Sequence, residues 1–419
     1  MNPSTLEVIG ALLFAVALIH TFSTKFFERL AHRQPKHAGL WHLLGEVEIV
    51  FGFWALVLVL FIFGLQGKQQ GTQYLDSRNY TEPLFVFAIM VVAGTRPVLQ
   101  FARDLVGFAA GALPLPRAMA LCFLTLTLVP LLGSVITEPA AMTLAALMLR
   151  DGLFQQNVSQ RLRYGVVGVL FVNVSIGGTL TPFAAPPVLM VAATWGWDMA
   201  YVFGHFGWKA ALAVTTNAAV LTLLFSKELR RLGVAAPVGI GPRVPASIVA
   251  VQLLFLTGVV VFAHHPPVFL GLFLFFMGFA TAYKDHQDRL ILREALLVAF
   301  FLAGLVVLGG QQQWWLQPAL LAMNADAVYW GATALTAITD NAALTYLGSL
   351  VPGLSAEFKV ALVAGAVTGG GLTVIANAPN PAGFAILRPH FEDQTIHPLG
   401  LLLAALPPTL VAACAFRLL

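Results

Sequence analysis

The chain has 419 residues, of which 58% are hydrophobic and only 10% are charged, with a formal net charge of +4. Soluble proteins carry about 25% charged residues, so this composition argues against a water-soluble protein and indicates one that resides in lipid. The length accommodates ten or so helical spans of about 20 residues each, and no polar stretch is long enough for a soluble domain. We therefore expect a single all-α integral membrane domain over residues 1–419.

Three apolar segments open the chain, at residues 7–25, 40–64 and 83–102, and we expect scaffold-like spans there within residues 1–116. The first has Glu7 and no basic leader, so we expect a retained span and not a cleaved signal. His20 lies inside it, and a hydrogen bond between helices is the expected role of that side chain.

The second segment begins with three polar residues that are secondary candidates for function. His42 and Glu46 are four residues apart, a spacing that predicts one shared helix face, and Glu48 follows. These residues could form a metal site or a proton path, although an interfacial or structural role is the simpler interpretation. Candidate partners for the two acids are Arg96, Arg103 and Asp104.

One short motif occurs twice in the chain. Residues 136–143 read Ile-Thr-Glu-Pro-Ala-Ala-Met-Thr, and residues 338–345 read Ile-Thr-Asp-Asn-Ala-Ala-Leu-Thr. Each copy places one carboxylate, Glu138 or Asp340, inside a long apolar segment, at 117–150 and 314–351. We predict that both segments are re-entrant hairpins that enter the membrane and turn at the acid. Capping of a hairpin helix is the alternative role for each acid.

Each copy is followed by an apolar segment that Gly and Pro interrupt, at residues 177–187 within 164–195 and at 369–381 within 357–388. Broken helices are tolerated in a membrane only where the freed backbone groups face protein, water or a ligand. Paired interrupted segments in two halves of a chain typically mark the binding site of a secondary transporter. We predict two broken transmembrane helices.

The positions of Lys and Arg predict the orientation. If the first loop is cytoplasmic and both hairpins return to the face they entered, 18 of the 23 Lys and Arg residues lie inside. The N-terminus is then outside, and the two halves have opposite orientations, which makes an inverted-topology repeat. Repeat 1 covers 117–226, with a further span at 208–226, and repeat 2 covers 314–416, with a span at 398–416. Connecting spans occupy 246–264, 267–283 and 294–312 within residues 246–312.

The side chains of the repeats favour a cation. Two carboxylates at one site would attract Na⁺, for which a proton would compete, and hard oxygen ligands suit a hard alkali ion. Neither motif contains Lys or Arg to clamp an anion. The predicted ion-binding residues are Glu138, Asp340, Asn341, Thr137, Thr339, Gly178, Thr181, Gly371, Thr373, Asn377 and Asn380. Glu138 and Asp340 are the predicted proton-coupling groups, and we expect no transition-metal site, cofactor or nucleic-acid partner.

The Thr-Glu-Pro and Thr-Asp-Asn tips and the Gly-rich segments resemble the ion-transporter superfamily, and residues 339–343 and 369–381 are most similar to its Na⁺/H⁺ antiporter families. The resemblance implies a scaffold, a moving transport part, an elevator-like motion and a homodimer. The Ser-Asn-Thr tips of the dicarboxylate branch are missing from this chain.

We therefore predict a multi-pass transporter of the inner (plasma) membrane that exchanges Na⁺ or Li⁺ for H⁺ by alternating access. An ion-coupled transporter of a small anion, a dicarboxylate or an oxyanion, is the main alternative. An intramembrane enzyme that uses the two acids is a more distant one.

Overall fold

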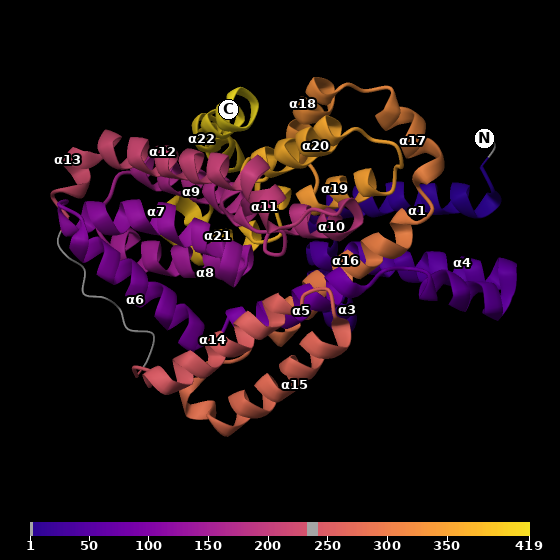
Figure 1. The fold of residues 1–419 in the computed structure, drawn as a ribbon, viewed down its shortest axis with the longest axis horizontal. Coiled ribbons are helices and arrows are strands. Elements are labelled where there is room, and N and C mark those ends of the chain that lie inside the picture. Colours follow the sequence, from indigo (N-terminus) through magenta and orange to yellow (C-terminus); the bar gives the residue numbers. More distant parts are fainter. Residues whose placement is uncertain (1–2, 233–241) are drawn as a thin grey trace.

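A computed structural model describes residues 3–232 and 242–419, and within these ranges the chain forms helices and no strands (Figure 1). Six of the described helices are long and apolar enough to cross a membrane, and a bent pair makes a seventh candidate. Large apolar side chains also face outward; on α15 (Pro266–Ala282), Leu274 is 71% and Phe275 is 76% exposed. Such apolar surfaces suit lipid, which confirms the prediction of an all-helical, multi-pass membrane protein.

The N-terminal helices begin and end differently from the predicted spans. Helix α1 covers Thr5–Thr21, α2 covers Thr24–Arg33, α3 covers Ala38–Leu44 and α4 covers Val47–Asp76. The span expected at 40–64 is therefore wrong at its start, because the chain breaks at Gly45 and Glu46 between α3 and α4. Helix α4 also kinks at Gly67, whose φ of 83° is favourable only for glycine.

The span predicted at 83–102 is not one continuous helix. Helices α5 (Thr81–Ala93) and α6 (Arg96–Ala112) meet at an angle of 66°. Pro97 explains the bend, because it has no N–H to donate to the carbonyl of Ala93 and it disfavours a helical conformation in the residue before it.

The region of the first motif consists of five main helices. They are α7 (Arg117–Ile136), α8 (Glu138–Leu149), α9 (Gln160–Gly177), α10 (Pro186–Trp195) and α12 (Trp208–Leu224). The interruption predicted in the segment 164–195 is present, because the chain leaves the helical path after α9 and resumes it at Pro186. We call residues 178–185 break 1.

The region of the second motif has the same order of elements. They are α18 (Ala325–Thr336), α19 (Asn341–Ser349), α20 (Ala356–Gly369), α21 (Asn380–Leu387) and α22 (Pro398–Leu418). We call residues 370–379, between α20 and α21, break 2. The segment predicted as a hairpin at 314–351 begins with a separate short helix, α17 (Gln313–Leu321).

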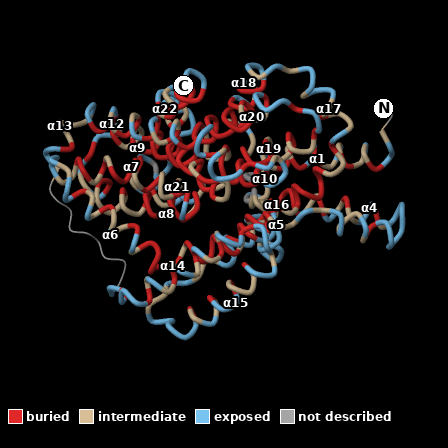
Figure 2. The backbone as a smooth tube through the Cα atoms, viewed as in Figure 1, coloured by how far each residue is buried: buried red, intermediate tan, exposed pale blue. Residues whose placement is uncertain are grey.

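The remaining helices form a second layer with the N-terminal ones. Helices α14 (Ala246–Val261) and α15 pack on α5, and α16 (Leu292–Gly309) packs on α4 and α5 (Figure 1). Buried residues concentrate in the other layer, around α9 and α20 (Figure 2). The two motif-bearing regions interlock there, because α10 packs against α19 and α21 packs against α8.

The two broken helices also touch each other directly. Ser175 Oγ on α9 donates a hydrogen bond to the carbonyl of Val367 on α20, over 2.7 Å. A Cβ atom at Gly371 would collide with the backbone of Val172, so glycine is needed for this close approach. The crossing of α9 and α20 places both breaks in the buried centre of the molecule.

Candidate functional site

Both carboxylates of the repeated motif lie where two helices join. Helix α7 ends at Ile136 and α8 begins at Glu138, so Thr137 alone makes the turn, with φ of 75° and ψ of 151°. A β-branched residue in this conformation costs on the order of 1–3 kcal/mol, and such strain is concentrated at functional sites. In the second motif, Asp340 stands directly before α19 as its N-cap.

Glu138 is fully buried and has a partner from the other motif region. Its Oε2 atom accepts a hydrogen bond of 2.9 Å from Nδ2 of Asn377, which lies in break 2. Its Oε1 atom has no hydrogen-bond partner among the described residues. A Cβ atom at Gly178 would lie 2.5 Å from that oxygen, so the glycine of break 1 allows the carboxylate to sit against the backbone.

Asp340 is half-buried and is held by backbone donors. Its Oδ1 accepts from the N–H groups of Ala342 (2.8 Å) and Ala343 (3.2 Å), and the carboxylate also interacts with the N–H of Ala378. Because Asn377 and Ala378 are consecutive, their Cα atoms are about 3.8 Å apart. The two acids therefore flank neighbouring residues of break 2, and the charge of Asp340 acts on Glu138.

Several buried oxygen atoms of the two motif regions have no hydrogen-bond partner within the described part of the chain, although buried polar groups are normally paired. They lie near the junctions of α7 with α8 and of α18 with α19, in break 2, and at the first residue of α21. They are Oγ1 of Thr137, Oε1 of Glu138, Oγ1 of Thr336 and Oδ1 of Asn341, Asn377 and Asn380. We call this set the buried oxygen cluster. It combines one carboxylate oxygen with neutral hydroxyl and amide oxygens, which are ligands that hard cations accept.

Other predicted site residues hold the breaks in shape. Thr181 Oγ1 donates to the carbonyl of Ser134 (2.7 Å), and Thr373 Oγ1 donates to that of Ala337 (2.8 Å). Asn380 Nδ2 donates to the carbonyls of Gly370 (2.8 Å) and of Thr373 (2.9 Å). These side chains satisfy backbone groups that the unwound helices leave free.

Two more predicted residues make other contacts. Thr339 Oγ1 donates to the carbonyl of the following residue, Asp340, over 3.3 Å. Gly371 contacts Val172 of α9, and its role is close packing of the two broken helices.

Sequence reasoning missed Ser134 on α7. Its Oγ donates to the carbonyl of Gly177 (2.8 Å) and accepts from the N–H of Leu180 (3.0 Å), so it ties both ends of the first turn of break 1 to α7. The available signal was its position, because Ser134 precedes Glu138 by four residues as Thr336 precedes Asp340.

Sequence reasoning also missed the polar pair Asn173 and Asn217. Asn173 Nδ2 donates to the carbonyls of Leu126 and Val214, and its Oδ1 accepts from Asn217 Nδ2 at 2.9 Å. These bonds join α7, α9 and α12 in the core.

The secondary candidates near residue 46 do not form the predicted arrangement. His42 is exposed on α3, whereas Glu46 is the N-cap of α4 beyond the break at Gly45, so the two residues share no helix face. Arg293 of α16 forms the ion pair with Glu46, in place of the predicted partners. Arg96 pairs with Asp288 instead, at 3.8 Å, and Asp104 pairs with Arg243, at 3.3 Å.

Glu48 lies in the first turn of α4, and its charge acts on Asp340. The prediction for His20 is confirmed: its Nδ1 accepts from Trp54 Nε1 at 3.0 Å, and its Nε2 lies 2.9 Å from the carbonyl of Leu44. Within the described residues, no group of three or more His, Cys, Asp and Glu side chains could hold a metal ion.

The comparison with protein families decides the kind of protein. Residues 5–419 match the family described as "Putative Na⁺/H⁺ antiporter". The chain belongs to this family. The match spans both motif regions and the scaffold-like helices, and it confirms the resemblance drawn from the tips and the Gly-rich segments. A search of curated proteins found no match. Membership of the antiporter family indicates a transporter.

Proposed function

We propose that the chain exchanges Na⁺ or Li⁺ for H⁺, and that the exchange takes place at Glu138 and Asp340. The observation that carries the proposal is the buried oxygen cluster, whose unpaired atoms include one oxygen of the fully buried carboxylate of Glu138. A dehydrated alkali ion needs several oxygen ligands, and these atoms would supply them. Residues of break 2 contact both acids, so binding of an ion at one acid would change the affinity of the other acid for its ion.

Exchange follows from competition for the same oxygens. A proton on a carboxylate removes the charge that holds Na⁺, and bound Na⁺ excludes the proton. Because the two ligands cannot be carried together, each half of the transport cycle moves one of them. Na⁺, H⁺ and the lipid bilayer are the partners that this mechanism requires.

The surroundings of Asp340 also favour a cation over the alternative anionic substrate. A helix N-terminus attracts anions through its free N–H groups. At α19, however, those groups already bind the carboxylate of Asp340. A dicarboxylate or oxyanion would have to approach two acids with no Lys or Arg in either motif to compensate.

We further propose how the site alternates between the two sides of the membrane. The two motif regions act as an inverted-topology repeat with re-entrant hairpins at α7–α8 and α18–α19, and they move together as the transport part. Helices α1–α6 and α14–α16 serve as the scaffold, in an elevator-like motion within a homodimer. The protein sits in the inner (plasma) membrane with its N-terminus outside and its first loop cytoplasmic, as the distribution of basic residues favours.

Proteoliposomes that contain the purified protein test the function. We expect an imposed pH gradient to collapse when Na⁺ or Li⁺ is added, and Glu138→Gln and Asp340→Asn to abolish this response. The matched control is Glu82→Gln, because Glu82 is another buried acid but lies at the start of α5, outside both motifs. Anion uptake with no response to Na⁺, or full exchange by both tip variants, would refute the proposal.

A further inference from the structure

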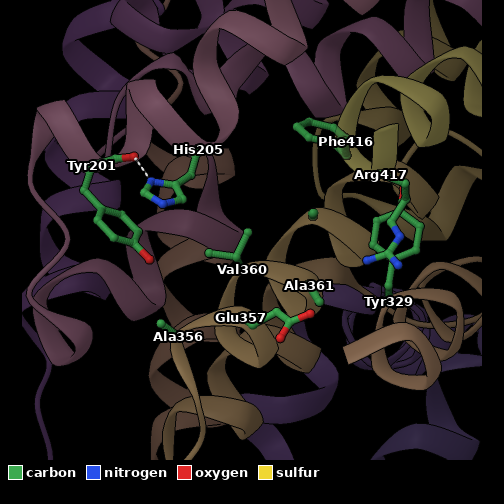
Figure 3. A pocket seen from close by; sticks show the side chains of 10 residues that line it. Tyr201, His205, Tyr329, Ala356, Glu357, Val360, Ala361, Phe416 and Arg417 are labelled. Atoms are coloured by element: carbon green, nitrogen blue, oxygen red, sulfur yellow. Dashed lines mark hydrogen bonds between the residues drawn. The ribbon is translucent and has the colours of Figure 1, made fainter. Parts of the chain in front are cut away.

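A separate pocket opens beside the second motif region. It has a volume of about 260 Å³, and it lies between α20, the end of α22, α18 and the residues just before α12. In Figure 3, Tyr201 and His205 lie on one side of it and Tyr329 and Arg417 on the other, with the α20 residue Val360 between them. We call this the outer pocket, because the same distribution of basic residues places this end of the helices outside the cell.

Tyr329 forms the buried floor of the outer pocket, and its hydroxyl is paired with that of Thr368, which does not line the pocket. Tyr329 lines the pocket, although its side chain is fully buried, and its hydroxyl lies 3.0 Å from Oγ1 of Thr368. Thr368 donates its own proton to the carbonyl of Ala364, at 2.7 Å. Tyr329 is therefore the donor to Thr368, and the pair joins the pocket floor to the last turn of α20.

Beneath that pair the chain enters break 2. Thr368 is followed by Gly369, where α20 ends, and then by Gly370, whose carbonyl accepts from Asn380. A Cβ atom at Gly370 would lie 2.9 Å from Nδ2 of Asn341. The end of α20 thus lies between the pocket floor and two members of the buried oxygen cluster.

The charges of the outer pocket favour a cation. Glu357, in the first turn of α20, lines the pocket and is exposed. The positive charge of Arg417 is paired with Asp326 and lies over the ring of Tyr329. Lys359, the nearby base on α20, is placed over the ring of Trp195. Among the charged side chains that line the pocket, Glu357 is therefore the one that can attract Na⁺.

We propose that the outer pocket is the external mouth of the ion path, and that the hydrogen-bonded pair of Tyr329 and Thr368 closes its inner end and separates it from the buried oxygen cluster in this conformation. This inference rests on the proposed exchange function and adds the route by which ions reach the site from outside.

Thiol modification tests the inference. In a Cys414→Ser background, which removes the exposed native thiol, Ala364→Cys places a thiol on the pocket wall. A membrane-impermeant trimethylammonium methanethiosulfonate is applied to the outside of oriented vesicles, and mass spectrometry follows the modification. We expect modification of residue 364 to lower Na⁺-driven exchange by about tenfold or more. Ala361→Cys, also on the wall, serves if the first variant does not fold.

The control is Pro352→Cys, an exposed position at the same end of the molecule that does not line the pocket. Its modification should change exchange by less than about twofold. Complete modification of residue 364 with exchange retained, or reaction from the inner side only, would overturn the inference alone. Absence of exchange in the unmodified proteins would overturn the proposed function and this inference with it.

Discussion

Replacing Asn377 by alanine removes the one hydrogen bond that the described residues make to the buried carboxylate of Glu138. A hydrogen bond to a charged group contributes about 1.5–3 kcal/mol, and here it stabilises the ionised form that Na⁺ requires. The loss corresponds to a factor of about 10–100 in an equilibrium constant. At fixed pH, we therefore expect the half-saturating Na⁺ concentration of Asn377→Ala to rise by about that factor.

Inside-out vesicles with a fluorescent ΔpH indicator give the Na⁺ dependence of exchange at several pH values. The Na⁺ response of Asn377→Ala should move to more alkaline pH by about one to two units relative to the wild type. Asn79→Ala is the matched control, because Asn79 also donates to a buried glutamate, Glu82, at 3.3 Å, but outside the two motifs. Na⁺ dependence within about twofold of the wild type in Asn377→Ala would refute the role assigned to this bond.

Three further predictions follow from the same site. Gly178→Ala should lower exchange by about tenfold or more, because its Cβ would lie 2.5 Å from Glu138 Oε1. The control Gly152→Ala, whose Cβ meets nothing within 4 Å, should leave exchange unchanged. Equal exchange activity of the two variants would contradict this prediction. Thr137→Gly should relieve a strained turn and stabilise the detergent-solubilised protein by about 1 kcal/mol, which thermal unfolding measures. The same change should weaken Na⁺ binding, because a hydroxyl oxygen is lost, and Na⁺ titration measures this effect. A lower melting temperature would contradict the expected stabilisation. In the wild type, the half-saturating Na⁺ concentration should rise by about tenfold for each unit by which pH falls on the acidic side of the profile, and a value independent of pH would contradict competition.

The sequence predicted the centre of the molecule better than its edges. Acids inside apolar segments are rare, and Gly and Pro interrupt helices for local steric reasons, so the helix junctions at Glu138 and Asp340 and the two breaks could be recognised without a structure. The bend at Gly94 and Thr95 had a similar local signal in Pro97, which the apolar character of the segment concealed. Hydropathy reports burial in lipid and does not report whether a helix is continuous.

Contacts between distant segments could not be predicted in the same way. That Asn377 and not Asn380 donates to Glu138 depends on how α21 packs against α8, which no local pattern records. The ion pair of Glu46 with Arg293 joins residues 247 positions apart, and the spacing of His42 and Glu46 suggested a helix face that the break at Gly45 removes. Short spacings are informative only where the helix is unbroken.

Proton release on Na⁺ binding tests the central claim most directly. Calorimetric titration of the purified protein with NaCl, in two buffers of different ionisation enthalpy, counts the protons released for each Na⁺ bound. We predict a release close to one proton for each Na⁺ near the midpoint of the pH profile, and none in the double variant Glu138→Gln, Asp340→Asn. Saturable Na⁺ binding that releases no proton in the wild type, or release that persists in the double variant, would contradict the account.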